Sequence, residues 1–468
     1  MPKKSISQIT SISLIILATV CLPNLAKHTK VLAQTPNYQA QILTYNQLQK
    51  NLISQNKYQS ALEISERSRN RTLVNLLAQQ LSISEVNAPS TEQIKQVAKQ
   101  QNATLVQYSI INDEVIIDGK KQTQESQLYI WVIQPTGDIA FRSVDLKPLW
   151  QKEKISLADL ITKSRQSIGV SSNYTKGIIK VSPVQTTNSR DNFQKLHQLL
   201  IIPIVDLLPT QPNAHIIFIP QGELFLVPFA ALKDTKSKYL IEQHTIATAP
   251  SIQALDLLYQ RQQKIQGVAK DVLIVGNPTM PSISLKPGEP PQKLLQLPGA
   301  EQEAKAIAHL FNTQVLTGDA ATETAVVQRM PQAKIIHLAT TAYLDDRQGL
   351  ALTPSGKDDG LLTSEEILNL KLKAELVVLS ANDTALGKII NDGVIGLSRS
   401  FFSAGVSSVI GSLWDISDQQ TAFLMIEFYQ KLSENPDKAA ALRYAMLATM
   451  KKYPNPQYWA AFTLIGVL

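Results

Sequence analysis

The sequence contains a single cysteine, Cys21, among its 468 residues. One cysteine cannot form a disulfide within the chain, and it cannot supply the several thiolates of a structural zinc site. Cys21 also lies in an apolar N-terminal stretch that is typical of an export signal. Removal of that stretch would leave a chain without a thiol, so the mature chain could not use a cysteine nucleophile.

Other sequence signatures of enzymes are missing as well. There is no glycine-rich phosphate loop, no Gly-X-Ser-X-Gly turn around a nucleophilic serine and no His-Glu-X-X-His zinc motif. His337 lies in the middle of an apolar run, and we interpret it as a structural histidine of the core. We therefore expect no metal and no organic cofactor.

The charge balance gives little reason to expect a nucleic-acid partner. The formal net charge of the chain is +7, but residues 1–33 contain four lysines and no acidic residue. The remainder has 41 basic and 38 acidic residues, a net charge of +3, which is too small for an electrostatic nucleic-acid interface. Apolar residues make up 44% of the composition, which is enough for a large core and for two or three domains.

Residues 1–33 predict a secretory signal peptide. Lys3 and Lys4 precede an apolar run over 12–22, and small residues precede a cleavage site at Gln34. We therefore expect an exported protein, periplasmic or extracellular, with no membrane span after the signal is removed. The alternative is an uncleaved N-terminal anchor, because the apolar run and its immediate flanks carry no charge.

Residues 34–100 predict a helical hairpin that resembles one tetratricopeptide-type repeat. Apolar residues recur at helical spacing before a turn at 56–57, and they recur again in a second helix from Tyr58 to Leu77. A single repeat cannot bury its apolar face alone, so we expect the hairpin to dock on the rest of the chain. We interpret three basic residues of the second helix as a solvated face: Arg67, Arg69 and Arg71.

Residues 101–190 predict a strand-rich segment that ends in a linker. Four runs rich in β-branched and aromatic residues are separated by turn residues, and they span 104–111, 115–117, 127–133 and 139–144. We expect these runs to form an antiparallel meander. Helical spacing follows over 157–168, and the poorly patterned stretch 170–188 is the predicted linker.

The most informative stretch runs from Ala333 to Gly387 and predicts a βαβ unit. Two apolar runs, 333–340 and 374–381, have the composition of strands that are buried on both faces of a parallel sheet. Between them, Thr363 and Glu366 have the spacing of a capping box at the start of a short helix. In open α/β sheets, binding and chemistry occur just beyond the carboxyl ends of the strands.

The two strand ends carry a family resemblance. The run Ile-Ile-His-Leu-Ala-Thr-Thr-Ala (335–342) resembles the His-X-Ala-Thr-His-Gly motif of the CHAT family of caspase-like domains. The run Leu-Ser-Ala-Asn-Asp-Thr-Ala-Leu-Gly (379–387) resembles the Leu-Ser-Ala-Cys-X-Thr-Gly-X-Gly motif of the same family. Further matches follow in order over 191–468. The resemblance implies a caspase-like α/β/α sandwich with a mostly parallel sheet, here preceded by the strand-rich segment and the helical hairpin.

The resemblance also implies that catalytic groups have been replaced. Family members that are peptidases use a His–Cys dyad, whose positions in this chain are Thr341 and Asn382. Two glycines of the motifs are likewise replaced, by Ala342 and Ala385. Polar residues around the strand ends are the candidates for holding a peptide without cutting it: Thr340, Thr341, Asn382, Asp383, Asp345 and Asp346.

Together these features predict an exported, catalytically inactive pseudopeptidase that binds an unknown peptide or protein partner. One alternative is an active hydrolase with an unrecognised nucleophile; Ser380 was considered, but we expect it to be buried in its strand. The other alternative is a purely structural interaction module with a closed cleft.

Overall fold

The computed structural model describes most of the chain after residue 35. The described residues are 36–69, 71–84, 86–117, 119–170, 189–211, 213–284, 290–343, 348–380, 388–390 and 393–468. The predicted signal peptide and most of the predicted linker therefore lie outside the described residues. No helix within these ranges is both long enough and apolar enough to span a membrane.

An eleven-stranded sheet, with strand order β3-β2-β1-β4-β5-β18-β17-β14-β10-β6-β9, forms the centre of the described structure. Its strands are β1 (Ala103–Ile117), β2 (Lys120–Ile133), β3 (Ile139–Asp145), β4 (His215–Ile219), β5 (Thr245–Thr248), β6 (Asp271–Pro278), β9 (Val315–Gly318), β10 (Ala333–Ala339), β14 (Leu376–Leu379), β17 (Ser408–Ser412) and β18 (Phe462–Gly466). Small sheets are formed by β11 (Ala342–Tyr343), β12 (Gly349–Ala351) and β13 (Leu361–Thr363), by β15 (Lys388–Ile390) and β16 (Gly393–Ile395), and by β7 (Ser282–Ile283) and β8 (Gln292–Lys293).

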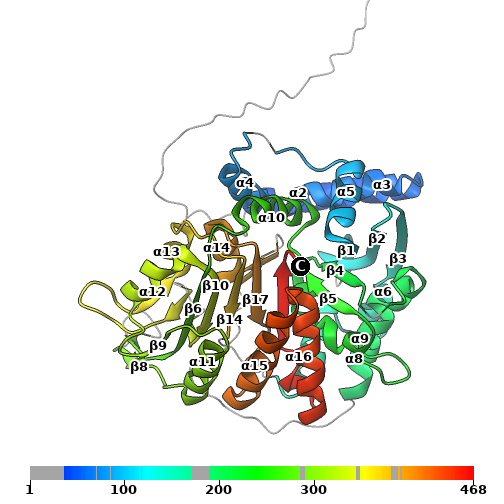
Figure 1. The fold of residues 1–468 in the computed structure, drawn as a ribbon. Helices are drawn as coiled ribbons and strands as arrows, with labels where there is room; N and C mark the ends of the chain where they lie inside the picture. Colours follow the sequence, from blue (N-terminus) through cyan, green and yellow to red (C-terminus); the bar gives the residue numbers. More distant parts are fainter. Residues whose placement is uncertain are drawn as a thin grey trace, which may run out of the picture.

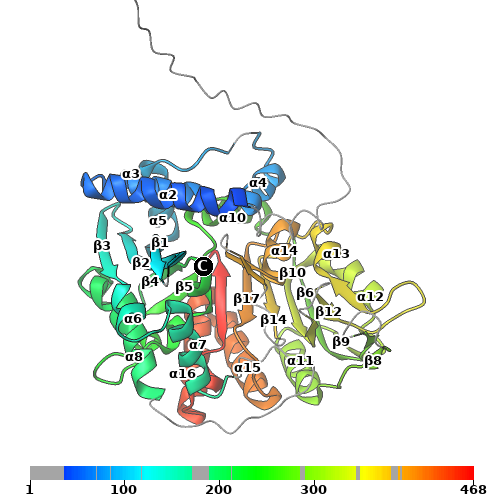
Figure 2. The same ribbon diagram turned by 180° about the vertical axis from the view of Figure 1, so that it is seen from behind.

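Helices cover both faces of the central sheet. They are α2 (Pro36–Ser54), α3 (Tyr58–Arg67), α4 (Arg71–Gln80), α5 (Thr91–Gln101), α6 (Lys147–Gln151), α7 (Leu157–Ser167), α8 (Ser189–Leu200), α9 (Leu240–Gln243), α10 (Ile252–Ile265), α11 (Pro298–Leu310), α12 (Glu323–Arg329), α13 (Ser364–Leu368), α14 (Leu397–Ala404), α15 (Asp418–Glu434) and α16 (Lys438–Lys452). Helices α11, α15 and α16 lie in front of the sheet in Figure 1, and α7 crosses the opposite face in Figure 2. This layering, around a mostly parallel sheet, confirms the predicted α/β sandwich.

Nine of the eleven strands form two parallel blocks that run in opposite senses, and β2 and β3 extend the first block with antiparallel pairing. The first block contains β1, β4, β5 and β18, and the second contains β17, β14, β10, β6 and β9. The blocks meet where β17 pairs antiparallel with β18, from Ser408 opposite Gly466 to Ser412 opposite Phe462. The carboxyl ends of the two blocks therefore point to opposite edges of the sheet.

The predicted meander is present, but it is part of the central sheet. Strands β1, β2 and β3 pair antiparallel in sequence order, and β1 also pairs parallel with β4. The prediction of separate strands at 104–111 and 115–117 was wrong, because β1 runs through both. The Asn-Asp pair that suggested a turn instead lies at a register shift after Ile111, which the strand absorbs without ending.

The βαβ unit is confirmed by the structure. Strand β10 pairs parallel with β14, with Leu338 opposite Leu379, and α13 lies between them in sequence. The Thr363 side chain accepts a hydrogen bond from the Glu366 backbone N–H, and the Glu366 carboxylate accepts one from the Thr363 N–H at 2.8 Å. The capping box therefore fixes the start of α13 where the sequence placed it.

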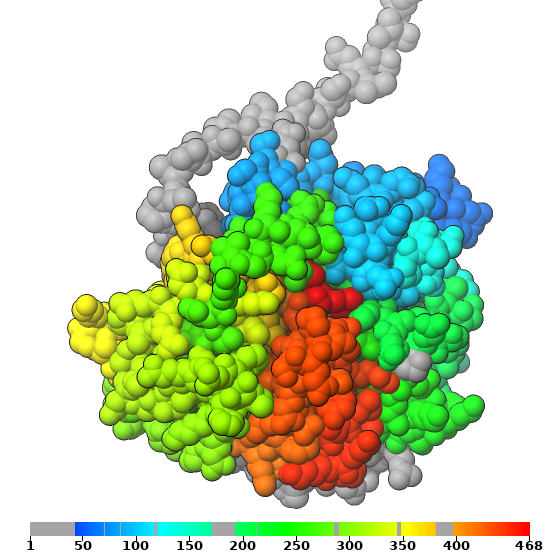
Figure 3. Space-filling model, in the orientation of Figure 1, coloured from blue at the N-terminus to red at the C-terminus, as the bar shows by residue number. Residues whose placement is uncertain are grey.

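The N-terminal helices α2, α3, α4 and α5 dock along one edge of the sheet (Figures 1 and 2). Leu73, Val74 and Leu77 of α4 are buried, as the docking prediction requires. In the space-filling view α4 and α5 lie directly against α10 (Figure 3). The predicted second helix, however, is divided into α3 and α4.

The solvated basic face was a wrong interpretation for Arg69, whereas Arg67 is exposed as predicted and Arg71 is half-buried. Arg69, between α3 and α4, is only 4% exposed, and its guanidinium donates to the carbonyl oxygens of Tyr108, Ile219 and Pro220. Burial lowers the pKa of Arg69 to about 10, and the charge of the buried Glu66 opposes that shift, so the side chain stays cationic near neutral pH. Arg69 therefore binds the carboxyl end of β4 in the first block, which sequence periodicity alone could not show.

Replacing Arg69 with methionine should lower the free energy of unfolding by about 3 to 5 kcal/mol. Three buried carbonyl groups would lose their donor, and the Glu66 carboxylate would remain buried without its compensating charge. Urea denaturation measures the change. Arg67→Met is the matched control, because Arg67 is exposed and its replacement should change stability by less than about 0.5 kcal/mol. Equal midpoints for the two variants would contradict this role of Arg69.

Candidate functional site

The candidate site lies where β10 and β14 of the second block end. Thr340 and Thr341 follow β10, and Ser380 follows β14; the backbone N–H of Ser380 donates to Leu338 O at 3.0 Å, so the two ends lie side by side. Of the residues predicted from the sequence, Thr340 and Thr341 are described. The other four candidates lie outside the described residues: Asn382, Asp383, Asp345 and Asp346.

The two threonines differ in what they can offer a ligand. Thr340 is fully buried, and its hydroxyl donates to Ala351 O at 2.6 Å. Thr341 is half-buried, and its carbonyl accepts from the Ala351 N–H at 2.9 Å. The hydroxyl of Thr340 is therefore committed to holding β12 against the end of β10, whereas the side chain of Thr341 is partly accessible.

A small cavity of about 20 Å³ lies at this edge, between the strand ends and the N-termini of α11 and α15. A cavity of that size has room for roughly one water molecule. Its lining includes the carboxylates of Glu303 and Asp418 and several hydroxyl groups, but no lysine, arginine or histidine. The residues that line it are Leu297, Ala300, Glu303, Thr340, Ser380, Ser412, Trp414, Ile416, Asp418, Thr421 and Phe462. The cavity thus presents mainly hydrogen-bond acceptors and negative charge.

The two helix N-termini at the cavity are joined by one contact. The Asp418 carboxylate, at the first residue of α15, accepts a hydrogen bond from the Gly299 N–H of α11 at 3.2 Å. A Cβ atom on Gly299 would lie only 2.1 Å from the Cβ of Asp418. Glycine at this position therefore permits the close approach, and Asp418 caps a free N–H of the neighbouring helix.

Sequence reasoning did not select Glu303, Ser412 or Asp418 as site residues. Ser412 ends β17, and Asp418 follows shortly after it, so the rule that polar residues gather at the carboxyl ends of parallel strands could have identified both. Glu303 is one turn inside α11, and no local pattern distinguishes it from a surface glutamate. Only the packing of α11 on the sheet places its carboxylate at the cavity.

A buried polar network extends from the cavity into the core. The Glu303 carboxylate lies 2.9 Å from His337 Nε2, and the Tyr429 hydroxyl lies 3.2 Å from His337 Nδ1. Burial, and secondarily the charge of Glu303, raises the pKa of Tyr429 well above its ordinary value, so its hydroxyl keeps its proton. Since a carboxylate only accepts, the proton that faces Glu303 belongs on Nε2, and the Tyr429 hydroxyl can donate to Nδ1. His337 is thus the structural core histidine that the sequence predicted.

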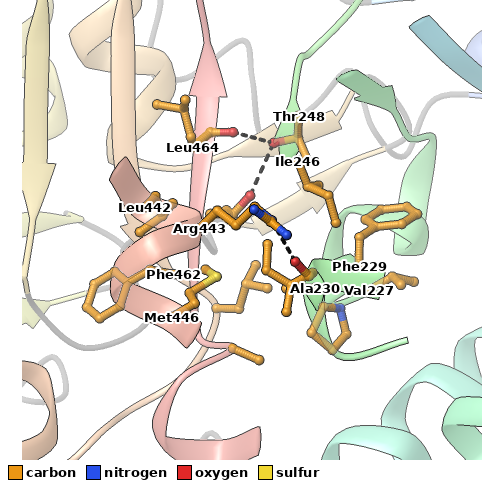
Figure 4. Close-up of a pocket in the computed structure, with 15 residues that line it drawn as sticks. Val227, Phe229, Ala230, Ile246, Thr248, Leu442, Arg443, Met446, Phe462 and Leu464 are labelled. Carbon is orange, nitrogen blue, oxygen red and sulfur yellow. Dashed lines mark hydrogen bonds between the residues drawn. The ribbon is translucent and has the colours of Figure 1, made fainter. Parts of the chain in front are cut away.

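A second, mostly apolar cavity of about 20 Å³ lies between α16, β5, β18 and the segment 227–230 (Figure 4). Phe462 lines both cavities. Arg443 is the only charged residue in the lining, and its Nε and Nη2 donate to Ile241 O at 2.8 Å and to Glu242 O at 2.9 Å. These two bonds commit the guanidinium to the end of α9, so this cavity has fewer polar groups for a ligand than the first.

Within the described ranges no three His, Cys, Asp or Glu side chains are placed to share a metal ion.

Replacing His337 with phenylalanine should lower the free energy of unfolding by about 3 to 5 kcal/mol, because the Glu303 carboxylate would be left buried without a partner. Adding Glu303→Leu should recover part of the loss, with a coupling energy of about 1 kcal/mol or more in the double-mutant cycle. His309→Phe, at an exposed position of α11, is the control. Strictly additive effects of the two core substitutions would contradict a direct interaction between Glu303 and His337.

This chain is similar to a known domain family and to two curated proteins. The CHAT domain matches residues 190–467. Human tetratricopeptide repeat protein 28 is 29% identical over 335 residues, covering 60% of this chain and 13% of that protein, and the mouse protein of the same name is 28% identical with the same coverage. This chain therefore spans only about 13% of the length of these curated relatives.

Among solved structures, the Saccharomyces cerevisiae separase–securin complex matches with a TM-score of 0.49 and 12% identity, covering 88% of this chain and 34% of that chain. The Arg-specific cysteine proteinase gingipain R matches with a TM-score of 0.40 and 11% identity, covering 68% of this chain and 75% of that chain. The domain match spans more than half of the sequence and includes both strand-end motifs. This chain therefore belongs to the CHAT domain family.

Proposed function

We propose that this protein binds a peptide, or an extended segment of a protein partner, at the carboxyl edge of the second block without cleaving it. The observation that carries the proposal is the residue at the end of β10. The family motif has its catalytic histidine there, and this chain has Thr341, with Asn382 at the position of the catalytic cysteine. Hydroxyl and carboxamide groups can hold a peptide by hydrogen bonds, but they lack the base and the thiolate of a cysteine peptidase.

The acids around the small cavity at Thr340 favour a ligand that brings hydrogen-bond donors to this edge of the sheet. Glu303 and Asp418 supply carboxylates to the lining of the cavity, and no basic side chain lines it. Backbone N–H groups and basic side chains of a peptide are donors of this kind. The N-termini of α11 and α15 moderate the negative charge there, because helix N-termini stabilise carboxylates.

A second candidate function is hydrolysis by a different nucleophile, and Ser380 is the residue that favours it. Ser380 lines the cavity, is only 7% exposed, and its hydroxyl has no hydrogen-bond partner among the described residues. Against this function, both ring nitrogens of His337 face other groups, Glu303 and Tyr429. A serine without a general base is a weak nucleophile, so we favour binding. A purely structural module remains the third possibility, and it predicts no peptide affinity at this edge.

The purified protein should bind peptides selected from a random display library and leave them intact. Asp418→Asn should weaken binding about tenfold, because it removes a charge from the cavity while keeping an acceptor for Gly299. Glu434→Gln, at the exposed far end of α15, is the matched control and should leave affinity unchanged. Fluorescence polarisation measures affinity, and mass spectrometry of the recovered peptide detects cleavage.

Three outcomes would contradict this function. Peptide cleavage that is lost in Thr341→Ala or Asn382→Ala would restore a peptidase role, and cleavage that is lost only in Ser380→Ala would favour the serine hydrolase. Failure to select any peptide whose binding depends on Asp418 would instead favour the structural module.

Export of the protein belongs to the same proposal and rests on residues 1–33. Mass spectrometry of the protein from its native host should find an N-terminus at Gln34, or failing that at Lys27. An intact Met1 terminus in the cytoplasmic fraction would contradict export, and an intact terminus in the membrane fraction would support the uncleaved anchor.

A further inference from the structure

The small sheet β11-β12-β13 extends from the end of β10 and forms a wall beside the candidate site. We call residues 348–363 of this sheet the flap. Ala351 attaches the flap to the strand end, because its carbonyl accepts from the Thr340 hydroxyl and its N–H donates to Thr341 O. Any loosening of the flap therefore acts directly on Thr340 and Thr341.

The turn 355–360 closes the flap and packs against the start of α12. The Thr324 hydroxyl of α12 donates to the Asp358 carboxylate at 2.6 Å, and the Glu323 N–H donates to Thr353 O at 3.2 Å. Gly360 has a φ of +77°, and a Cβ on it would lie 2.7 Å from the carbonyl oxygen of Leu352. The turn thus has little freedom to rearrange while α12 stays in place.

Glu323, the first residue of α12, lies beneath this turn with its carboxyl group buried. The side chain is 7% exposed, and its Oε2 has no hydrogen-bond partner in the described parts of the chain. The strongest charge interactions on it come from acids, Glu366 of α13 and Asp358 and Asp359 of the turn, and the backbone N–H of Gly360 donates a hydrogen bond to the carboxyl group. Lys357, in the same turn, is exposed. The other ionisable residue of its own helix, Arg329, lies at the opposite end. An ionised Glu323 would therefore face three like charges, with the Gly360 N–H as its hydrogen-bond donor.

Burial, followed by the charges of these three acids, raises the pKa of Glu323 to about 7 from an ordinary value of 4.5. When the pKa of a carboxyl group is higher in the folded state than in the unfolded state, folding becomes less favourable as the pH rises from the unfolded-state pKa to the folded-state pKa. Below about pH 4.5 the group is protonated in both states, and above about pH 7 it is charged in both. The closed flap therefore loses stability between these two values, and ionisation within the closed flap itself occurs near neutral pH.

We propose that Glu323 makes the flap a pH-responsive wall of the candidate site. With the carboxyl group protonated, the turn 355–360 packs against α12 and the flap holds the end of β10. When the group ionises, repulsion from Asp358, Asp359 and Glu366 favours opening of the flap, which frees Thr340 and Thr341 from Ala351. This device does not depend on which ligand the site takes, so it can be tested without one.

Hydrogen exchange of the full-length protein, corrected for the intrinsic exchange rate, tests the proposal. Between about pH 5 and pH 7, amide protection of peptides covering 349–363 should fall at least about tenfold, because Glu323 ionises readily in the open flap across this range but must give up a strongly held proton in the closed flap. In Glu323→Gln the flap should stay protected at both pH values. Glu365→Gln, at an exposed neighbouring position of α13, should behave like the wild type.

Strand β14 is the internal reference, because its protection reports the stability of the whole sheet. Wild-type flap protection that does not change with pH would overturn the proposal. So would a pH-dependent loss that persists in Glu323→Gln, or a loss that β14 shares equally. If Glu323→Gln fails to fold, Glu366→Gln and Asp359→Asn provide the second test. Each removes one repelling charge, which lowers the pKa of Glu323 in the closed flap toward its ordinary value, so the loss of protection should be smaller than in the wild type. An undiminished loss in both variants would overturn the proposal.

Discussion

The antiparallel pairing of β17 with β18 is the constraint on which the arrangement of the whole sheet depends. Every pairing from β1 through β18 is parallel within one block, and every pairing from β17 through β9 is parallel within the other. Because this antiparallel pair joins the two blocks, their carboxyl ends face two different edges. The molecule thus has two edges of the kind at which α/β proteins bind ligands.

The two edges differ in whether the protein's own side chains occupy the strand ends. At the first block, Arg69 donates to carbonyl groups at the end of β4, while the Glu66 carboxylate accepts from the N-terminus of α10 at 3.1 Å. Arg69 and Glu66 thus connect the N-terminal helices to β4 and to α10. A guanidinium can make several such bonds at once, whereas a lysine could not match the same spread of acceptors. The first edge is thereby filled from within the chain.

At the carboxyl ends of the second block there is a cavity, and the carboxylates of Glu303 and Asp418 line it. Gly299 and Asp418 set the separation of α11 and α15, and that separation determines where the carboxylates lie relative to the strand ends. Glu303 connects the cavity to His337 in the core, so a change in charge at the cavity would act on a residue that is fully buried. A buried pair of this kind is costly to break, because either partner alone would be left without compensation. These contacts restrict how far the site can rearrange.

The sequence by itself determined the local features of this protein. The apolar runs at 333–340 and 374–381 predicted adjacent parallel strands, Thr363 and Glu366 predicted the start of α13, and the strand-end motifs predicted the CHAT family. Each is set by neighbours within a few residues, through periodicity, capping or a contiguous motif. Tertiary structure alone decided the rest: that Arg69 is buried, that β1 joins β4, and that Glu303, Ser380 and Asp418 share one cavity. Those outcomes depend on contacts between residues that are tens to hundreds of positions apart, and neither composition nor spacing along the chain records which distant surfaces will meet.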